Sequence, residues 1–313
     1  MGDFRDSSVT SMDSTKSSTG SPESSIETDA STKSEEYNKK IVQLSKDELI
    51  GDYKVVRRLG AGGCGVVYQV KANGKNYAMK VERTDMDKAD QLLGIEAHVL
   101  KRLQSSPYAV PFIQYGSCQS KGLGLRVLTM GLLGPSIDEL RKQQIKGKFK
   151  IGTVLKIGIQ AIQAVTFVHC SYFVHRDVKP GNFAIGEDNC KRIYLFDFGL
   201  SRAIKKRGDL HLRTMREDIP FRGTSEYCSL NELTTGDLPW MGRSRSKTTI
   251  LKTKLMDFEY MHGCPVAFST ILNYLRTLDY YKRPDYIGIE QAFFRMMAAR
   301  ESDWNQPMDW EVN

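Results

Sequence analysis

The residues best suited to chemistry lie in V-H-R-D-V-K-P-G-N-F, which spans residues 174–183. Asp177, Lys179 and Asn182 stand there at short spacings, and Asp197 follows in L-F-D-F-G-L. A carboxylate can orient a hydroxyl, an ammonium can offset phosphate charge, and carboxylate and amide oxygens can hold magnesium. The set therefore predicts phosphoryl transfer. A polar loop without chemistry is the alternative, but it would not need all four residues at these spacings.

A glycine-rich stretch upstream could cradle the phosphates. Its glycines match G-x-G-x-x-G, and they are Gly60, Gly62 and Gly65. Dinucleotide-binding folds share this motif, but there the loop runs into a helix, whereas here the β-branched and aromatic stretch V-V-Y-Q-V predicts a strand. Asn73-Gly74 then predicts a hairpin turn. A third strand follows and carries Lys80, which favours a phosphate loop between strands and disfavours a dehydrogenase.

Three further elements are expected to position these residues. Residues 87–103 have apolar side chains at helical spacing, namely Leu92, Ile95, Val99 and Leu103. Glu96 in this helix is the best partner for Lys80, with Asp87 and Asp90 as alternatives. Ser136 and Glu139 predict a capping box at the start of another helix. A largely apolar helix over 152–170 leads into the catalytic stretch.

Composition describes an ordinary globular chain with a polar leader. The 313 residues are 40% hydrophobic and 26% charged, with a formal net charge of +8. A basic chain favours anionic partners such as ATP, acidic peptides or nucleic acid, although a solubilising surface is an equal explanation. Residues 1–48 are rich in Ser and Thr and are expected to be a disordered tail, either phosphorylated or merely flexible.

The cysteines and the apolar stretches indicate the cellular compartment in which the protein is expected. The six cysteines are scattered without a C-x-x-C pair, which indicates reduced intracellular thiols. No apolar stretch is expected to reach the length of a membrane span, and no signal-peptide core is evident. We expect a cytoplasmic, and also nuclear, location without a membrane partner.

The order of these motifs resembles the protein kinases. L-L-G-P-S-I-D-E-L, from Leu132, resembles the hinge of the casein kinase 1 superfamily, and K-V-E-R, F-A-I-G and F-R-G-T are most similar to its tau-tubulin kinase branch. The resemblance implies an α+β, two-lobed fold over residues 49–313. A small lobe of antiparallel sheet with one helix would cover about 49–130, and a mainly helical large lobe would cover about 134–313.

The same resemblance implies roles for the site residues. Asp177 would be the catalytic base, Lys179 would steady the γ-phosphate, and Asn182 and Asp197 would hold Mg²⁺. Lys80, paired with Glu96, would contact the α- and β-phosphates of ATP. Thr224 would bond near Asp177 and, together with Lys179, indicates a serine/threonine kinase. The implied ATP-binding residues are Leu59, Gly60, Gly62, Gly65, Val67, Ala78, Lys80, Met130 as gatekeeper and Leu132 in the hinge.

The expected partners are protein substrates. Bases between Asp197 and Tyr227 suggest an acidic-substrate groove, with a solvated charged loop as the equal alternative. The family usually has an arginine where this chain has Glu226, and a carboxylate there puts a preference for phosphorylated substrates in doubt. We expect a monomer that binds no nucleic acid.

One departure from the family pattern concerns stability. Asn231 runs directly into E-L-T-T-G-D-L-P-W, so a loop and the large lobe's central buried helix, about 30 residues, are expected to be missing. Losing five large apolar side chains would remove roughly 7–15 kcal/mol, comparable to a net stability of about 5–15 kcal/mol. The sequence thus predicts a serine/threonine kinase, with a catalytically weak or inactive kinase-like interaction protein as the alternative.

Overall fold

The computed structural model describes residues 42–62, 65–86, 91–205, 212–213, 264–278 and 281–312. They belong to one compact unit, Val42–Asn313, which is distinct from Met1–Ile41. Thr224, Glu226 and the Asn231–Glu232 junction lie outside the described residues. The expected loss of the central helix therefore stays a prediction.

The folded part begins earlier than the expected boundary at residue 48. Val42 is 4% exposed, and its carbonyl accepts a hydrogen bond from the Tyr68 hydroxyl at 2.7 Å. The Leu44 amide donates to the same hydroxyl oxygen at 3.0 Å. One buried apolar side chain and two long-range hydrogen bonds hold this segment on the small lobe, although its composition continues that of the polar leader.

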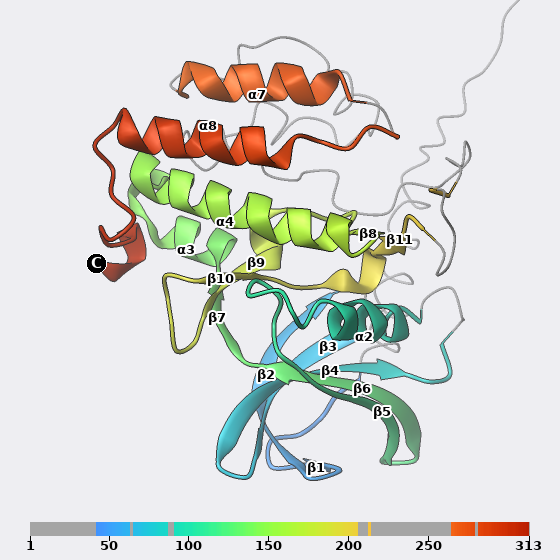
Figure 1. Ribbon diagram of the computed structural model, residues 1–313. Helices are drawn as coiled ribbons and strands as arrows, with labels where there is room; N and C mark the ends of the chain where they lie inside the picture. Colours follow the sequence, from blue (N-terminus) through green and yellow to red (C-terminus); the bar gives the residue numbers. More distant parts are fainter. Residues whose placement is uncertain are drawn as a thin grey trace, which may run out of the picture. The chain divides into compact units, whose positions relative to one another are not determined.

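Six strands of the small lobe form one antiparallel sheet in the order β1-β2-β3-β4-β6-β5 (Figure 1). They are β1 (Leu49–Ile50), β2 (Tyr53–Gly62), β3 (Gly65–Ala72), β4 (Lys75–Arg83), β5 (Phe112–Ser120) and β6 (Leu123–Gly131). The predicted hairpin turn is confirmed, because Asn73 and Gly74 both have positive φ, 49° and 76°, between β3 and β4. Two consecutive positive φ values match the twist of a two-residue hairpin.

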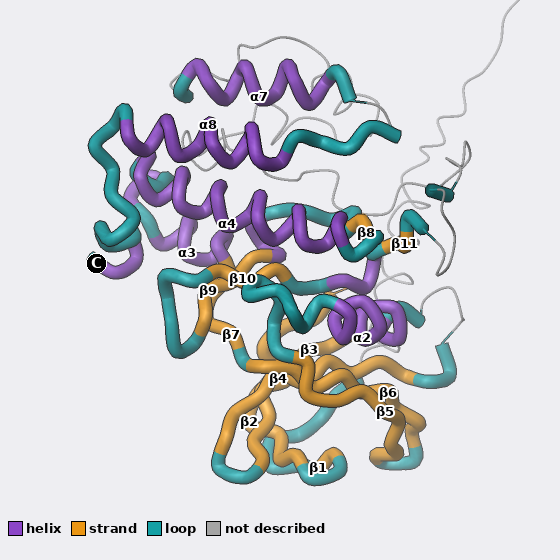
Figure 2. The backbone as a smooth tube through the Cα atoms, viewed as in Figure 1, coloured by secondary structure: helices purple, strands orange, loops and turns teal. Residues whose placement is uncertain are grey.

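Helix α2 (Leu93–Arg102) is the helix of the small lobe (Figure 2). The apolar side chains that it buries include Leu93, Ala97 and Leu100, at the i, i+4, i+7 spacing of one helical face. Ile95 was expected on that face, but its side chain points outward and is 43% exposed. The expectation for Ile95 was wrong because Leu93, not Leu92, begins the buried stripe.

Two short sheets lead from the small lobe toward the catalytic stretch. The first has the order β10-β9-β7, and the second pairs β11 with β8. Their strands are β7 (Leu133–Ser136), β8 (Phe173–Val174), β9 (Phe183–Gly186), β10 (Ile193–Leu195) and β11 (Arg202–Ala203). Helix α3 (Ile137–Gln143) follows β7, and its capping box is confirmed by reciprocal hydrogen bonds between Ser136 and Glu139.

The large lobe is layered from longer helices, which are α4 (Ile151–Cys170), α7 (Val266–Arg276) and α8 (Tyr286–Ala298). Helix α8 lies between α4 and α7 (Figure 1). Short 3-10 helices complete the described part, and they are η1 (Ile145–Gly147), η2 (Pro180–Asn182), η3 (Phe198–Leu200) and η5 (Asp309–Glu311). An antiparallel sheet in one lobe and helices in the other confirm the predicted α+β class.

Helix α4 corrects one expectation about apolar length. By length and composition alone it could cross a membrane, whereas no stretch was expected to reach that length. More than half of the apolar stretch is buried inside the protein, as in the core helix of a globular lobe. Its lysine, Lys156, is 2% exposed, and its ammonium donates a hydrogen bond to the Gln306 carbonyl. The buried ammonium thus has a hydrogen-bond acceptor inside the fold.

Candidate active site

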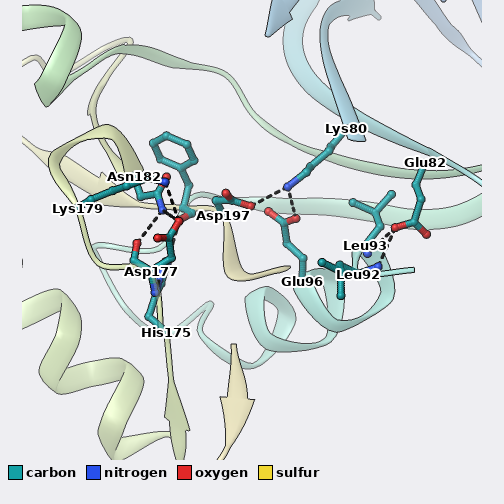
Figure 3. Close-up of polar contacts among 11 residues, drawn as sticks. Lys80, Glu82, Leu92, Leu93, Glu96, His175, Asp177, Lys179, Asn182 and Asp197 are labelled. Atoms are coloured by element: carbon teal, nitrogen blue, oxygen red, sulfur yellow. Dashed lines mark hydrogen bonds and ion pairs between the residues drawn. The ribbon is translucent and has the colours of Figure 1, made fainter. Parts of the chain in front are cut away.

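Strand β4, helix α2 and the residue before η3 bring three charged groups together. The Lys80 ammonium lies 2.6 Å from Glu96 Oε2 and 2.8 Å from Asp197 Oδ1 (Figure 3). The side chains of Lys80 and Glu96 are 8% and 2% exposed, so this pair is shielded from water. The structure thus forms the predicted Lys80–Glu96 pair and adds Asp197 to it.

Burial and the shared ammonium push the two carboxyls in opposite directions. Burial raises the pKa of Glu96, even though the Lys80 ammonium opposes the shift. Burial acts in the same direction on Asp197, but the Lys80 charge and hydrogen bond outweigh it and hold the pKa of Asp197 below its usual range. The lowered pKa keeps Asp197 ionised, as a cation ligand must be.

The predicted catalytic stretch folds around Asp177, which is 7% exposed. Lys179 Nζ donates to Asp177 Oδ2 at 2.8 Å. Asn182 Nδ2 donates to the Asp177 carbonyl at 2.7 Å and to Asp177 Oδ2 at 3.0 Å. These bonds hold the carboxylate in one orientation. Pro180 favours the start of η2 between Lys179 and Asn182, because its fixed φ suits the first position of a helix.

Asp197 links the two groups of residues. In Figure 3 its side chain lies between the Lys80–Glu96 pair and the group formed by Asp177, Lys179 and Asn182. Its backbone has φ 64° and ψ 63°, a left-handed conformation that is uncommon for residues other than glycine and that contacts around Asp197 help to enforce.

His175 supplies part of that enforcement and was not among the predicted site residues. Its imidazole is 1% exposed, with Nε2 3.0 Å from the Phe196 carbonyl and its ring against the Phe198 ring at 5.1 Å. Phe196 and Phe198 flank Asp197 on both sides. The signal in the sequence was the histidine of H-R-D itself, a polar aromatic residue between an apolar strand and the predicted catalytic aspartate.

The predicted nucleotide-binding residues lie close together on the small-lobe sheet. Gly60 pairs with Val67, and Val67 pairs in turn with Lys80 on β4. Ala78 pairs with the predicted gatekeeper Met130 on β6. Leu132 follows Met130 by two residues and packs, like Val67, against the core.

The glycine loop shows where a side chain would not fit. Gly65 has φ 116°, and a Cβ there would lie 2.5 Å from the Val81 carbonyl oxygen, so only glycine suits this position. Gly62 pairs with Gly65 across the loop, and Leu59 on β2 is 38% exposed. Residues 63 and 64 at the loop tip lie outside the described part.

The donor set fits magnesium held with the help of phosphates. Asn182 uses its amide hydrogens on Asp177, so its Oδ1 is oriented to act as a ligand. Asp197 contributes a carboxylate that is 31% exposed. Among the described residues no cluster of three or more His, Cys, Asp or Glu could hold a metal by itself. Magnesium commonly binds one or two protein oxygens together with substrate phosphates and water, which matches this pair.

Of the predicted basic stretch between Asp197 and Tyr227, the structure describes residues 197–205 and 212–213. Lys205 stacks over the Tyr172 ring, with Nζ 4.9 Å from its centroid. The Arg213 amide donates to the Ile204 carbonyl at 2.8 Å. Thr224 lies outside the described residues, so the structure does not place it beside Asp177.

A two-lobed fold with these polar groups defines a class of protein, and comparisons with known proteins agree with it. The family model of the protein kinase domain matches residues 53–237. A probable serine/threonine-protein kinase of Dictyostelium discoideum is 34% identical over 289 residues, which cover 84% of this chain. This chain belongs to the protein kinase family, and the predicted kinase fold is confirmed. The matched region spans 57% of the Dictyostelium protein's length.

Proposed function

We propose that this chain is a serine/threonine protein kinase that transfers the γ-phosphoryl group of ATP to hydroxyls of protein substrates. The observation that carries the proposal is the convergence of Lys80, Glu96 and Asp197 with Asp177, Lys179 and Asn182 in one site. The Dictyostelium relative, a probable serine/threonine-protein kinase, supports the same activity.

Each residue has a task in this proposal. The oxygen of the substrate hydroxyl forms a bond to the γ-phosphorus, and Asp177 accepts the hydroxyl proton. The bond between the γ-phosphorus and the oxygen that bridges to the β-phosphate breaks, which releases ADP. Lys179 offsets charge on the transferred group, and Lys80 holds the α- and β-phosphates. Asn182 and Asp197 would hold Mg²⁺, which neutralises charge on the phosphates when it is bound. Leu59, Val67, Ala78, Met130 and Leu132 would line the adenine.

The finer assignments rest on motifs alone. The hinge-like L-L-G-P-S-I-D-E-L supports a place in the casein kinase 1 superfamily, near the tau-tubulin kinase branch. The net charge of +8 supports acidic protein substrates, and Glu226 argues against dependence on an existing phosphate. We further propose a monomer in the cytoplasm and nucleus that binds neither nucleic acid nor membrane.

An inactive kinase-like interaction protein is not favoured as the alternative. Such a protein would have no need for Asp177, Lys179 and Asn182 to be hydrogen-bonded in one arrangement. The question of the missing central helix falls on residues outside the described part, so it favours neither function.

A phosphorylation assay on casein with Mg-ATP tests the proposal. We expect transfer to serine and threonine, and Asp177→Asn should reduce the rate at least about 100-fold, because the amide cannot accept the proton. Transfer by the wild-type chain no faster than by Asp177→Asn would overturn the proposal. Thermal unfolding of both proteins controls for misfolding, since Asn is nearly isosteric with Asp.

A further inference from the structure

A second carboxylate on β4 has no task in the chemistry just described. Glu82 follows Lys80 by two residues on this strand, and its side chain is 1% exposed. Residues at i and i+2 of a strand point to the same face, so Lys80 and Glu82 both point toward α2. Figure 3 shows Lys80 reaching Glu96 of α2, and Glu82 reaching the start of the same helix.

Glu82 caps α2 from another element. Its Oε2 accepts hydrogen bonds from the backbone amides of Leu92 and Leu93, at 2.8 and 2.9 Å. Helix α2 begins at Leu93, and the side chain of its N-cap residue Leu92 makes no capping hydrogen bond. The first amides of a helix need an acceptor, and negative charge is favoured at that end. Here strand β4 supplies both.

Arg126 on β6 balances the buried charge. Its Nη1 lies 3.5 Å from Glu82 Oε1 and donates to Gln91 Oε1 at 2.5 Å. Glu82 Oε1 makes no hydrogen bond among the described residues, so Arg126 stabilises this oxygen by charge alone. A buried carboxylate is costly unless charges and donors surround it. An apolar residue would avoid that cost, but it could not hold the amides of α2.

We propose that Glu82 is a positioning residue, which holds α2 at the distance and rotation that bring Glu96 to Lys80. Helix α2 is attached to β4 at two points, the Glu82 cap at its first turn and the Lys80–Glu96 pair one turn later. Movement of α2 away from Lys80 must break both attachments. This inference rests on the proposed kinase function for its rate readout only.

Two variants of Glu82 and one matched control test the proposal. Glu82→Gln keeps an acceptor but loses the charge, and Glu82→Met keeps the size but loses both. The control is Asp285→Ala, because Asp285 Oδ1 caps α8 by accepting from the Gly288 amide at 2.9 Å, on a helix that carries no proposed site residue.

We expect kcat to fall in the order wild type, Glu82→Gln, Glu82→Met, with roughly a tenfold loss in the last as the competent position of α2 is depopulated. The KM for ATP should change less than about threefold, because the ATP-lining residues of the sheet stay in place. Asp285→Ala should lower the melting temperature and leave kcat unchanged. Hydrogen exchange of residues 91–103 should rise in both Glu82 variants and not in the control.

Hydrogen exchange separates this proposal from the proposed function. Unchanged exchange of α2 in Glu82→Gln and Glu82→Met would overturn the positioning role, whatever the rates are. A kcat that is unchanged in a folded Glu82→Met protein would overturn it too. If the wild-type chain transfers phosphate no faster than Asp177→Asn, the kinase function is refuted. The hydrogen exchange of α2 then tests the positioning role of Glu82 by itself. If Glu82→Met does not fold, the same comparisons on Glu82→Gln decide.

Discussion

At the scale of single residues, Lys80 is the group on which the site's electrostatics depend. One ammonium faces the carboxyls of Glu96 and Asp197 at 2.6 and 2.8 Å. Without it, two acidic side chains would face each other, one of them 2% exposed. Removing one partner of a buried pair costs far more than the pair contributes net, because the remaining charge loses its compensation.

We therefore predict that Lys80→Met lowers the rate of phosphoryl transfer about 100-fold or more, and lowers the free energy of unfolding by about 3–5 kcal/mol. Adding Glu96→Gln should restore most of the stability and none of the activity, because the amide removes the more deeply buried of the two carboxylates that Lys80 compensates. Chemical denaturation and single-turnover rates of both variants provide the measurement. Equal stability of the single and double variants would contradict this account.

At the scale of elements, the packing of α4 on α8 relies on a glycine. Gly158 on α4 faces the Phe293 ring of α8, and a Cβ at Gly158 would lie well inside contact distance of that ring. Phe293 is 1% exposed and packs against Phe268 of α7, with the ring centroids 5.5 Å apart. The Phe293 ring is therefore enclosed on the sides of α4 and α7, and it packs all three helices together.

For Gly158→Ala two effects oppose each other. Alanine favours the helix by about 1 kcal/mol, whereas overpacking a filled core costs typically 1–3 kcal/mol. We predict a net loss of stability, seen as a lower denaturation midpoint. Gly152→Ala in the same helix is the control, since its Cβ would meet only the Ser302 side chain at 3.2 Å, and it should be neutral or stabilising. A midpoint for Gly158→Ala at or above wild type would refute the packing argument.

Strand β4 shows the same principle from the side of function. Ala78, Lys80 and Glu82 alternate along it and share one face. One strand thus aligns a predicted adenine contact, the lysine proposed to bind the phosphates and the cap of α2. A site held on a strand keeps its geometry better than one held on a loop.

At the scale of the whole molecule, contacts distant in sequence close the large lobe. Asp309 Oδ2 accepts from the Lys150 amide at the start of α4, at 2.5 Å. The Trp310 indole donates to the Cys190 carbonyl at 3.1 Å and stacks edge-on against Phe149. Two histidines complete the connections, because the half-buried His169 bonds the Tyr286 hydroxyl of α8 and the buried His175 bonds the Phe196 carbonyl.

These histidines predict how stability depends on pH. Burial lowers the pKa of both His169 and His175 below the ordinary 6.5. Between those lowered values and 6.5 the unfolded chain binds more protons than the folded one, so the free energy of unfolding rises with pH there. The melting temperature should therefore fall as pH drops below 6.5.

Melting temperatures at about pH 7.5 and about pH 5.5 measure this effect. His169→Phe keeps an aromatic ring beside Tyr286 but cannot take up a proton. It should be less stable than wild type at the higher pH and lose less on acidification. An equal loss in both proteins would show that His169 does not contribute to the pH dependence.

Local patterns in the sequence predicted local structure well. The Asn73-Gly74 turn and the Ser136–Glu139 capping box formed as expected, since both depend on backbone geometry over a few residues. The catalytic stretch also formed as a unit, because Asp177, Lys179 and Asn182 are too close in sequence to separate. Ile95 failed because a shift of one residue in the helical phase turns a side chain from core to solvent.

The V-H-R-D-V-K-P-G-N-F stretch and D-F-G determined by themselves which chemical groups this protein carries, because that depends only on residue type and short spacing. The tertiary structure decided which groups meet. Lys80 joins Glu96 across 16 positions and Asp197 across 117. Glu82 can cap α2 only because the start of this helix packs against β4. Contacts between residues so far apart in the sequence result from the packing of whole helices and strands. A short sequence pattern does not specify that packing.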